Sequence, residues 1–372
     1  MKKLLYFIGE DTAFLTHRFN LAKAAQTAGF EVHVLTRFTT HESTLKNAGF
    51  ITHGLKFFSR GGMNPFRDLL CLQELILSYR RIKPDCVHHV AWKPVLYGSI
   101  AAQITKVSKV INALTGMGYL FISQSIKAWL VRTIVQFLLP RILKSLNHIM
   151  ILQNPDDYAL AKDFLKIPSH HLKIIEGSGV DIKVFKPAAS FPKGRLQFIC
   201  VSRMLWDKGI RELVEATRLV KLTHASFDVI LCGDTDPHNP AAIPSDQLRQ
   251  WERQGLIKWK GRINDVASIY KQGHVAILPS YREGLPKALL EAAACGLPII
   301  TTDVPGCSLV VQNHKTGLLV PPKNYRKLAE AMVQLLTNPS LRADLGHNGR
   351  QLVVERFSDP VIIKQFLDVY SS

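Results

Sequence analysis

Two short, largely apolar runs, VAILPS at residues 275–280 and PIITT at 298–302, enclose a helical segment at 286–295. Runs of this length without a regular polar alternation are typical of strands that are covered on both faces. A helix that joins two such strands crosses from one to the next and makes them parallel. The segment therefore predicts an α/β fold with a parallel sheet.

The same alternation of strand and helix occurs in both halves of the chain. In the first half, predicted strands lie at residues 4–8, 31–36, 86–90, 110–114 and 148–152, with a helix at 17–29. In the second half, strands at 196–202, 227–233 and 256–261 and a helix at 209–222 precede the segment described above. Residues 177–194, between the halves, are rich in Gly, Pro and Ser and indicate a domain boundary.

We therefore predict two doubly wound, Rossmann-like α/β domains that face a cleft. The predicted domains span residues 1–185 and 186–356, and residues 357–372 form a C-terminal helix that packs back toward the N-terminal domain. A chain of 372 residues suits two domains, and its 47% of hydrophobic residues supply enough side chains for two cores.

The cysteines and the beginning of the chain point to the cytoplasm. The six cysteines form no CxxC pair and no zinc-ligand spacing, so we expect small buried residues in a reducing compartment. The start, MKKLLYFIGED, meets two acids after a short apolar run, which predicts a first strand and not a signal peptide. No stretch reaches the ~18 consecutive apolar residues of a membrane span, so a soluble cytoplasmic protein is expected.

Positive charge is concentrated in the first half of the chain. The net charge is +18, and residues 1–190 hold 24 Lys and Arg against 12 Asp and Glu, whereas the remainder holds 23 against 17. No acid occurs between Asp85 and Asp156, but seven bases do. Such a stretch favours an anionic membrane surface as partner, although a generically basic protein is an alternative. The sequence lacks helix-turn-helix, RNA-binding aromatic and zinc-finger patterns, so nucleic acid is not expected.

Residues 125–147 are predicted to form a long apolar helix with four bases and no acid. As a membrane-surface helix, it would place four large apolar side chains in the interface: Trp129, Leu130, Phe137 and Leu138. The bases do not share one face, and Pro140 is expected to break the helix. A core helix of the first domain is therefore the alternative.

Several common catalytic signatures are absent. The sequence has no GxGxxG after the first strand, no P-loop, no GxSxG elbow and no HExxH. Asp234 and Asp236 follow a predicted strand, and two carboxylates so spaced can hold Mg²⁺ or Mn²⁺ against a diphosphate. The surrounding Pro-containing loop and the architecture of the chain argue against that alternative, so no metal is expected.

An anion-binding loop is predicted within PSYREGLPKALLEA, residues 279–292. A strand ends there and Pro286 stands where helices begin, so the amides of residues 284–287 lie near a helix N-terminus. Glu283 lies in the loop and Glu291 lies in the helix. Carboxylates accept hydrogen bonds from sugar and ribose hydroxyls, so these two can hold different parts of one ligand.

A second loop, VSRMLWDKGI at residues 201–210, also follows a strand and opens a helix. Its Arg203 and Lys208 can pair with a diphosphate. Ligands of open parallel sheets bind outside the carboxyl ends of the strands. The two loops together therefore predict a nucleotide-sugar site.

These two loops resemble those of the GT-B glycosyltransferases of family 4, the large retaining family. SRMLWDKG resembles the family's Arg and Lys-Gly segment, and SYREGLPKALLEAAACGLPIITTDVPG resembles its motif of two glutamates separated by seven residues. NHKTGLLVPP, at 313–322, resembles the family's closing segment. The resemblance covers residues 195–357 strongly and the first domain more loosely. The start GEDTAFLTHR is similar to bacterial surface-polysaccharide enzymes with an acidic first loop.

The resemblance implies a GT-B fold with an N-terminal acceptor domain and a C-terminal nucleotide-sugar domain. It implies that Glu283 contacts donor-sugar hydroxyls, that Glu291 contacts the ribose, and that no cofactor is required. Arg203 and Lys208 would neutralise the diphosphate. The other implied residues are Gly284, Leu285 and Pro286 in the phosphate loop, Arg262 and Ile263 beside the base, and His89 and Asn112 at strand ends facing the cleft. His89 joins Glu283, Arg203 and Lys208 as a catalytic candidate, but a buried structural histidine is an equal alternative.

The resemblance also implies the reaction. We expect a retaining transfer of a hexose or N-acetylhexosamine from a UDP-sugar to a polyprenyl-diphosphate-linked saccharide in bacterial surface-polysaccharide synthesis. The enzyme would be peripheral on the cytosolic face of the inner membrane. A nucleotide-sugar epimerase on the same fold and a non-catalytic membrane- or polyanion-binding protein are the alternatives.

Overall fold

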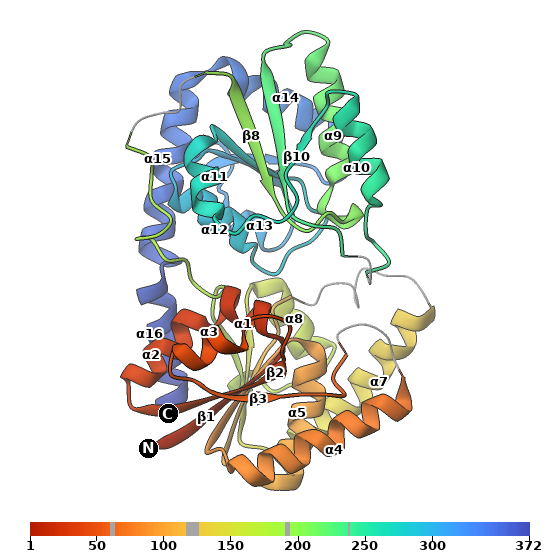
Figure 1. Ribbon diagram of the computed structural model, residues 1–372, viewed down its shortest axis with the longest axis vertical. Helices are drawn as coiled ribbons and strands as arrows, with labels where there is room; N and C mark the ends of the chain where they lie inside the picture. Colours follow the sequence, from red (N-terminus) through yellow and green to blue (C-terminus); the bar gives the residue numbers. More distant parts are fainter. Residues whose placement is uncertain (60–63, 117–125, 190–193, 237–238) are drawn as a thin grey trace. The chain divides into compact units, whose positions relative to one another are not determined.

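The computed structural model describes residues 1–59, 64–116, 126–189, 194–236 and 239–372. Within them the chain forms two compact units, each built on its own parallel sheet (Figure 1). The first unit comprises residues 1–178 and 362–372, and the second comprises residues 179–361. The predicted α/β class with two Rossmann-like sheets is therefore confirmed. The chain passes between the units at 178/179 and 361/362, whereas the sequence suggested 185/186 and 356/357.

The first unit has a seven-stranded parallel sheet in the order β3-β2-β1-β4-β5-β6-β7. Its strands are β1 (Lys2–Glu10), β2 (Phe30–Arg37), β3 (Ile51–Gly54), β4 (Cys86–Val90), β5 (Lys109–Ala113), β6 (His148–Leu152) and β7 (Leu172–Ile174). Its helices are α1 (Asp11–His17), α2 (Phe19–Thr27), α3 (Glu42–Asn47), α4 (Pro65–Ile82), α5 (Trp92–Thr105), α7 (Ile126–Leu143), α8 (Pro155–Asp163), the 3-10 turn η1 (Ser169–His171) and most of α16 (Asp359–Ser371). The strand order reverses between β1 and β4, as in other doubly wound sheets.

Helices cover both faces of this sheet. Successive residues of a strand point to opposite faces. Leu5 and Phe7 of β1 pack with residues of α4, α5 and α7, whereas Leu4 and Tyr6 pack with residues of α1, α2 and α16. This double cover explains why the middle of β1 is apolar on both faces and why β4 is buried along its whole length.

The first loop differs from the prediction. The predicted helix at 17–29 begins too late, because α1 starts at Asp11, directly after β1, and the chain breaks at Arg18 before α2. The buried Asp11 carboxylate accepts hydrogen bonds from the amides of Thr39 (2.9 Å), Thr40 (3.1 Å) and His41 (2.9 Å). Burial alone would raise the pKa of Asp11, but the hydrogen bond from the Thr39 hydroxyl, at 2.6 Å, and these main-chain hydrogen bonds lower it below its ordinary value. The acidic first loop therefore fixes the loop that follows β2.

The expected break at Pro140 is wrong. α7 runs through Pro140 to Leu143, and the Lys144 amide bonds to the Pro140 carbonyl at 3.0 Å. Proline removes one helical N–H, but Leu139 and Leu143 are buried in the core of the unit, and that burial offsets the loss. No helix in the described ranges is both long and apolar enough to cross a membrane.

The second unit has a six-stranded parallel sheet in the order β10-β9-β8-β11-β12-β13. Its strands are β8 (Leu196–Val201), β9 (Phe227–Cys232), β10 (Lys258–Trp259), β11 (Val275–Leu278), β12 (Ile299–Thr302) and β13 (Gly317–Val320). Its helices are η2 (Trp206–Lys208), α9 (Ile210–Lys221), α10 (Ser245–Arg253), α11 (Val266–Gln272), α12 (Lys287–Ala294), α13 (Cys307–Val310), α14 (Tyr325–Thr337) and α15 (Pro339–Arg356). The predicted βαβ segment is present as β11, α12 and β12.

All six cysteines are buried and unpaired, as the sequence predicted. Four of them lie in the second unit, where burial raises the pKa of the thiols of Cys200, Cys295 and Cys307 to about 12. Thiols with pKa values this high remain protonated and have a packing role.

Candidate functional site in the second unit

Three loops of the second unit follow the carboxyl ends of the central strands β8, β9 and β11. The loop after β11 contains Glu283 and ends at Pro286, which is the N-cap of α12. Leu285 is buried beneath it, and Gly284 is partly exposed. The predicted loop and helix start are therefore present, and the first turn of α12 directs its main-chain N–H groups toward this loop.

Lys208 and Glu283 form an ion pair although they are far apart in the sequence. The Lys208 Nζ atom lies 2.6 Å from Glu283 Oε1, and the two side chains are 17% and 13% exposed. The buried Ser280 hydroxyl donates to the same oxygen at 2.7 Å. Both bonds use Oε1, so Glu283 Oε2 has no protein partner among the described residues and remains available to a ligand hydroxyl.

Arg203 lies at the end of β8 and pairs with Asp236 in the loop after β9. The distance from Arg203 Nη1 to Asp236 Oδ2 is 2.8 Å. This pair is more exposed than the first one, with 45% of the arginine side chain and 22% of the aspartate side chain accessible. The structure thus brings both predicted diphosphate-binding cations to the carboxyl ends of the strands, each beside a carboxylate.

Two glycines allow these loops to approach one another closely. Gly209 has φ +70°, and a Cβ atom there would lie 2.0 Å from the Pro279 carbonyl oxygen. Gly306 has φ +83°, and a Cβ atom there would lie 2.3 Å from the carbonyl oxygen of Gly284. Any side chain at either position would force the Lys208 or the Glu283 loop to move.

The Glu291 side chain, on α12, is partly buried among protein atoms and remains partly accessible to solvent. Burial raises its pKa from 4.5 to about 7, and the nearby Lys287 lowers it only partly. A carboxylate that is poorly solvated yet accessible gains more than an exposed one when hydroxyl groups donate to it.

Arg262 and Ile263 follow β10, and Arg262 is exposed whereas Ile263 is partly buried. The Gly233 amide bonds to the Gly261 carbonyl at 2.7 Å, which ties this loop to the end of β9. The predicted base-framing residues therefore adjoin the loop that carries Asp236.

His89 and Asn112 belong to the first unit and are fully buried. The His89 ring nitrogens contact Tyr79 Oη at 2.9 Å and Asn112 Oδ1 at 2.8 Å, and burial lowers the pKa of His89 to about 4. A Cβ atom on Gly98 of α5 would lie 2.5 Å from the ring, so the imidazole is enclosed beneath α5. These contacts favour the structural alternative that the sequence left open for His89.

Several residues that shape the site were not predicted from the sequence. They are Ser280, Thr302, Asp236 as an ion-pair partner, and the two close-packed glycines. Thr302 donates to the Ser280 carbonyl and so holds the loop that carries Glu283. The stretch TTDVPG was a usable signal, since its Pro-Gly pair in the loop after β12 indicates a turn in which a glycine can approach another main chain closely.

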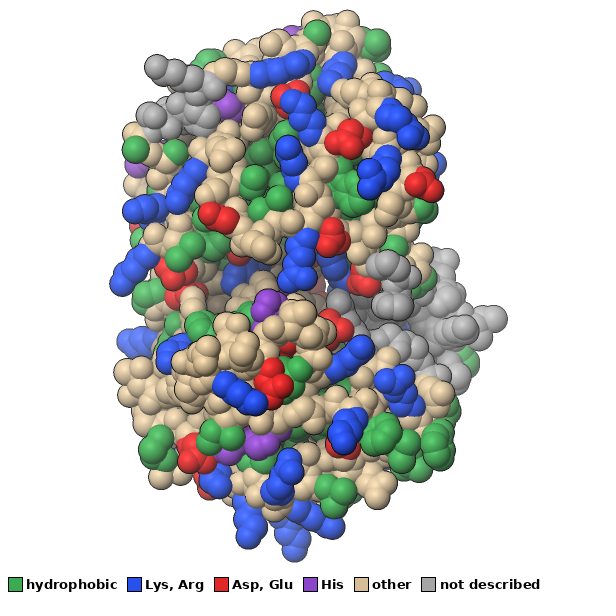
Figure 2. All heavy atoms as spheres, viewed as in Figure 1, with side chains coloured by type: hydrophobic (Ala, Val, Ile, Leu, Met, Phe, Trp, Pro, Cys, Tyr) green, Lys and Arg blue, Asp and Glu red, His purple; other side chains and the backbone are tan. Residues whose placement is uncertain are grey.

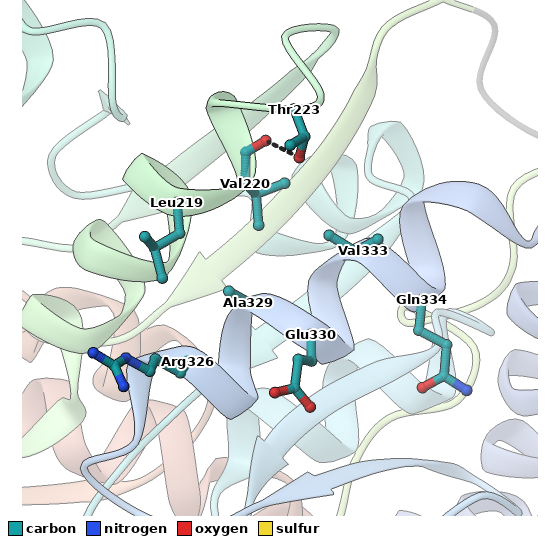
Figure 3. Close-up of a pocket in the computed structure, with 8 residues that line it drawn as sticks. All are labelled: Leu219, Val220, Thr223, Arg326, Ala329, Glu330, Val333 and Gln334. Carbon is teal, nitrogen blue, oxygen red and sulfur yellow. Dashed lines mark hydrogen bonds between the residues drawn. The ribbon is translucent and has the colours of Figure 1, made fainter.

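In the part of the chain that the structure describes, no group of three His, Cys, Asp or Glu side chains is placed to hold a metal ion. A groove elsewhere in the second unit encloses about 530 Å³ between α9 and α14 (Figure 3). It is lined by Leu219, Val220, Thr223, Arg326, Ala329, Glu330, Val333 and Gln334. None of these is a predicted site residue.

Comparisons with known proteins agree with the two-sheet fold, and one matched family spans the loops that contain Arg203, Lys208 and Glu283. The family described as "Glycosyl transferases group 1" matches residues 181–352, and "Glycosyl transferase 4-like" matches residues 3–146. Together with two parallel-sheet units and charged loops at the strand ends, these matches define a glycosyltransferase of GT-B fold. Both matches agree with the resemblance to family 4 that the motifs predicted.

The chain is similar to two enzymes over most of its length. It is 26% identical to N,N'-diacetylbacillosaminyl-diphospho-undecaprenol alpha-1,3-N-acetylgalactosaminyltransferase of Campylobacter jejuni, covering 98% of this chain and 97% of the relative. It is 25% identical to UDP-Gal:alpha-D-GlcNAc-diphosphoundecaprenol alpha-1,3-galactosyltransferase of Escherichia coli, covering 82% of this chain and 79% of the relative. These relatives give no support to the epimerase or non-catalytic alternatives.

A solved structure confirms the fold. Anabaena HepE in complex with UDP-glucose is similar with a TM-score of 0.81 and 17% identity, and the likeness covers 100% of both chains.

Proposed function

We propose that this glycosyltransferase moves a hexose or N-acetylhexosamine, with retention, from a UDP-sugar to a polyprenyl-diphosphate-linked saccharide in bacterial surface-polysaccharide synthesis. The part of this proposal that concerns the UDP-sugar donor rests on the cluster of Lys208, Glu283 and Ser280 at the N-terminus of α12. It offers a cation, a carboxylate oxygen and helix amides within one loop system, which suits a sugar diphosphate.

Each donor-site residue has a distinct proposed task. Arg203 and Lys208 neutralise the diphosphate as its charge grows during bond cleavage, and the amide end of α12 assists them. Glu283 accepts a hydroxyl of the donor sugar through Oε2, and Glu291 accepts the ribose hydroxyls. Arg262 and Ile263 flank the base. These side chains replace a metal ion, so the reaction is proposed to need none.

Retention is proposed to proceed without a protein nucleophile. Glu283 already holds Lys208 and Ser280, which suits positioning better than attack on the sugar. The leaving diphosphate would then assist the acceptor on the front face of the sugar. The protein supplies orientation and charge stabilisation.

The acceptor half of the proposal rests on the relatives. Both the C. jejuni and the E. coli enzymes are named for undecaprenyl-diphosphate-linked acceptors, and the E. coli name specifies a UDP-sugar donor. A polyprenyl acceptor is confined to a bilayer, so the enzyme must reach a membrane surface.

Helices α4 and α7 support a peripheral attachment of the first unit to an anionic membrane. On α4, Phe66 and Leu69 are 72% and 64% exposed, and on α7 Trp129 and Phe137 are 58% and 57% exposed. Figure 2 shows hydrophobic side chains gathered over α4, with Lys and Arg side chains nearby. Apolar side chains flanked by bases are the pattern of an interfacial helix.

The decisive activity experiment is a donor screen with the purified protein. UDP release is measured for several UDP-sugars with and without lipid acceptors extracted from bacterial membranes. Release that requires both substrates, and that fails in Lys208→Ala, supports the proposal. An epimerase would instead convert the UDP-sugar without any acceptor. No turnover of any UDP-sugar with membrane acceptors would overturn the proposal.

Membrane attachment is tested by sedimentation with liposomes. The protein should sediment with anionic vesicles but not neutral ones and should be released by about 0.5 M salt, because added salt shortens the Debye length from ~10 Å at 0.1 M. Phe66→Ser with Leu69→Ser should weaken sedimentation, whereas Leu222→Ser, at an equally exposed site of the second unit, should not. Lys127→Glu with Arg132→Glu should weaken it as well. Equal sedimentation with both vesicle types, or with neither, would contradict the attachment.

A further inference from the structure

The loop after β9 contains an acidic pair, Asp234 and Asp236, that the proposed donor site does not use. In the structure this loop is bound to the loop after β8. The Met204 amide bonds to the Asp234 carbonyl at 3.0 Å, and a Cβ atom on Gly233 would lie 1.9 Å from the Ser202 carbonyl oxygen. The main chain thereby holds Asp236 beside Arg203, where their side chains pair at 2.8 Å.

The two cations proposed to bind the diphosphate are thus both paired with carboxylates, but in different surroundings. The Lys208–Glu283 pair is largely buried and is supported by Ser280. The Arg203–Asp236 pair is open to water, with the arginine side chain 45% exposed. Exposed pairs contribute little stability and separate readily, whereas a pair that is buried and hydrogen-bonded persists.

We propose that Asp236 competes with the donor diphosphate for Arg203. Asp236 pairs with the guanidinium in the free enzyme and separates from it when the diphosphate of the nucleotide binds. The pair forms again as UDP leaves. The proposal rests on the proposed function, in which Arg203 binds a diphosphate.

The competition follows from charge and distance. A phosphate oxygen that accepts from the same guanidinium nitrogen must come within a few ångströms of the Asp236 carboxylate. Like charges at that distance repel, so the carboxylate must turn away or raise the free energy of the complex. Asp236 therefore weakens UDP binding and shortens the time for which the product stays bound.

The test is calorimetric titration of UDP into the wild type, Asp236→Asn, Arg203→Ala and the double variant, all in EDTA. We expect Asp236→Asn to bind UDP about fivefold more tightly, which corresponds to about 1 kcal/mol, the upper range for an exposed ion pair. In the Arg203→Ala background, the same substitution should change affinity less than twofold, because there is no guanidinium to compete for.

Glu215→Gln is the matched control. Glu215 pairs with Arg218 at 3.4 Å on α9 and is 41% exposed, so its replacement removes the same charge from a similar pair in the same unit. Its UDP affinity should equal that of the wild type. An equal gain in Glu215→Gln, or an undiminished gain in the double variant, would show a general charge effect and overturn the competition.

Two other outcomes distinguish this inference from the proposed function. Weaker UDP binding by Asp236→Asn, or wild-type binding that needs Mg²⁺ and is lost in Asp236→Asn, overturns the competition and leaves a positioning or metal-holding role for this aspartate. No UDP binding by the wild type, with or without Mg²⁺, overturns the proposed function, and the competition falls with it.

Discussion

Replacing Glu291 by glutamine should stabilise the protein above pH 7 and at the same time weaken its binding of UDP. Burial raises the pKa of this carboxyl group from 4.5 to about 7, so the folded protein favours the neutral acid. At 1.36 kcal/mol per pH unit, this difference is equivalent to about 3 kcal/mol. Because water still reaches the side chain, we expect about 1–3 kcal/mol.

The sign of the effect depends on pH. The raised pKa stabilises the wild type fully below about pH 4.5, and this contribution is lost as the pH rises through about 7. Glutamine stays neutral at every pH and loses nothing. The free energy of unfolding of the variant should therefore equal that of the wild type near pH 4.5 and exceed it by a growing amount up to about pH 7. Above that pH the difference should stay constant.

Urea unfolding at pH 5, 6, 7 and 8 measures this difference in the free energy of unfolding. Glu330→Gln on α14, where the side chain is 62% exposed, is the control and should show no such trend. A constant difference between Glu291→Gln and the wild type at all four pH values would refute the reasoning about burial.

The same carboxylate should link UDP binding to a proton. If ribose hydroxyls donate to ionised Glu291, binding lowers its pKa and expels the proton that the free enzyme holds near pH 6. Calorimetry in two buffers with different ionisation enthalpies should detect release of part of one proton in the wild type and none in Glu291→Gln. Proton release that persists in the variant would assign it to another group.

Three further outcomes test the site. Arg203→Ala and Lys208→Ala should each lower turnover about 10²–10³-fold, because each removes a charge partner of the leaving diphosphate; normal turnover by folded variants would remove them from the site. Activity should survive EDTA, and complete loss that Mg²⁺ restores would support the metal alternative. Gly306→Ala should lower both the melting temperature and UDP affinity more than Gly255→Ala does, because both glycines have positive φ but only Gly306 meets a carbonyl oxygen at 2.3 Å. Equal effects would show that backbone strain alone is responsible.

Local signals predicted the strands and the donor loop well. The expected strands at 86–90 and 148–152 have the bounds of β4 and β6, and the helix expected at 286–295 is α12, which is one residue shorter at each end. These elements are fixed by apolar runs and by Pro or Gly at their ends, which are properties of neighbouring residues.

Long-range pairing could not be predicted in the same way. Lys208 and Glu283 are 75 residues apart, and they meet because β8 and β11 are adjacent in the sheet. His89 was expected at a strand end that faces a cleft. It is buried instead, because α5 covers it and Gly98 of α5 leaves room for the ring. Such contacts follow from strand order and helix placement, which no local pattern in one sequence specifies.

The last helix of the chain has a consequence for how the first unit acquires its structure. Tyr370 of α16 bonds to Tyr6 of β1 at 2.9 Å and to His88 of β4 at 2.7 Å, and Phe366 lies beside the buried Arg18 guanidinium. During synthesis, residues 1–178 leave the ribosome long before α16 exists. The polar groups of Tyr6 and His88 therefore lack their partner on α16 until the whole second unit has been synthesised. A fragment ending at residue 178 would expose Tyr6 and the apolar surface around it. The first unit should therefore mature only after α16 has been synthesised, and chains that terminate within the second unit would be incomplete in both units.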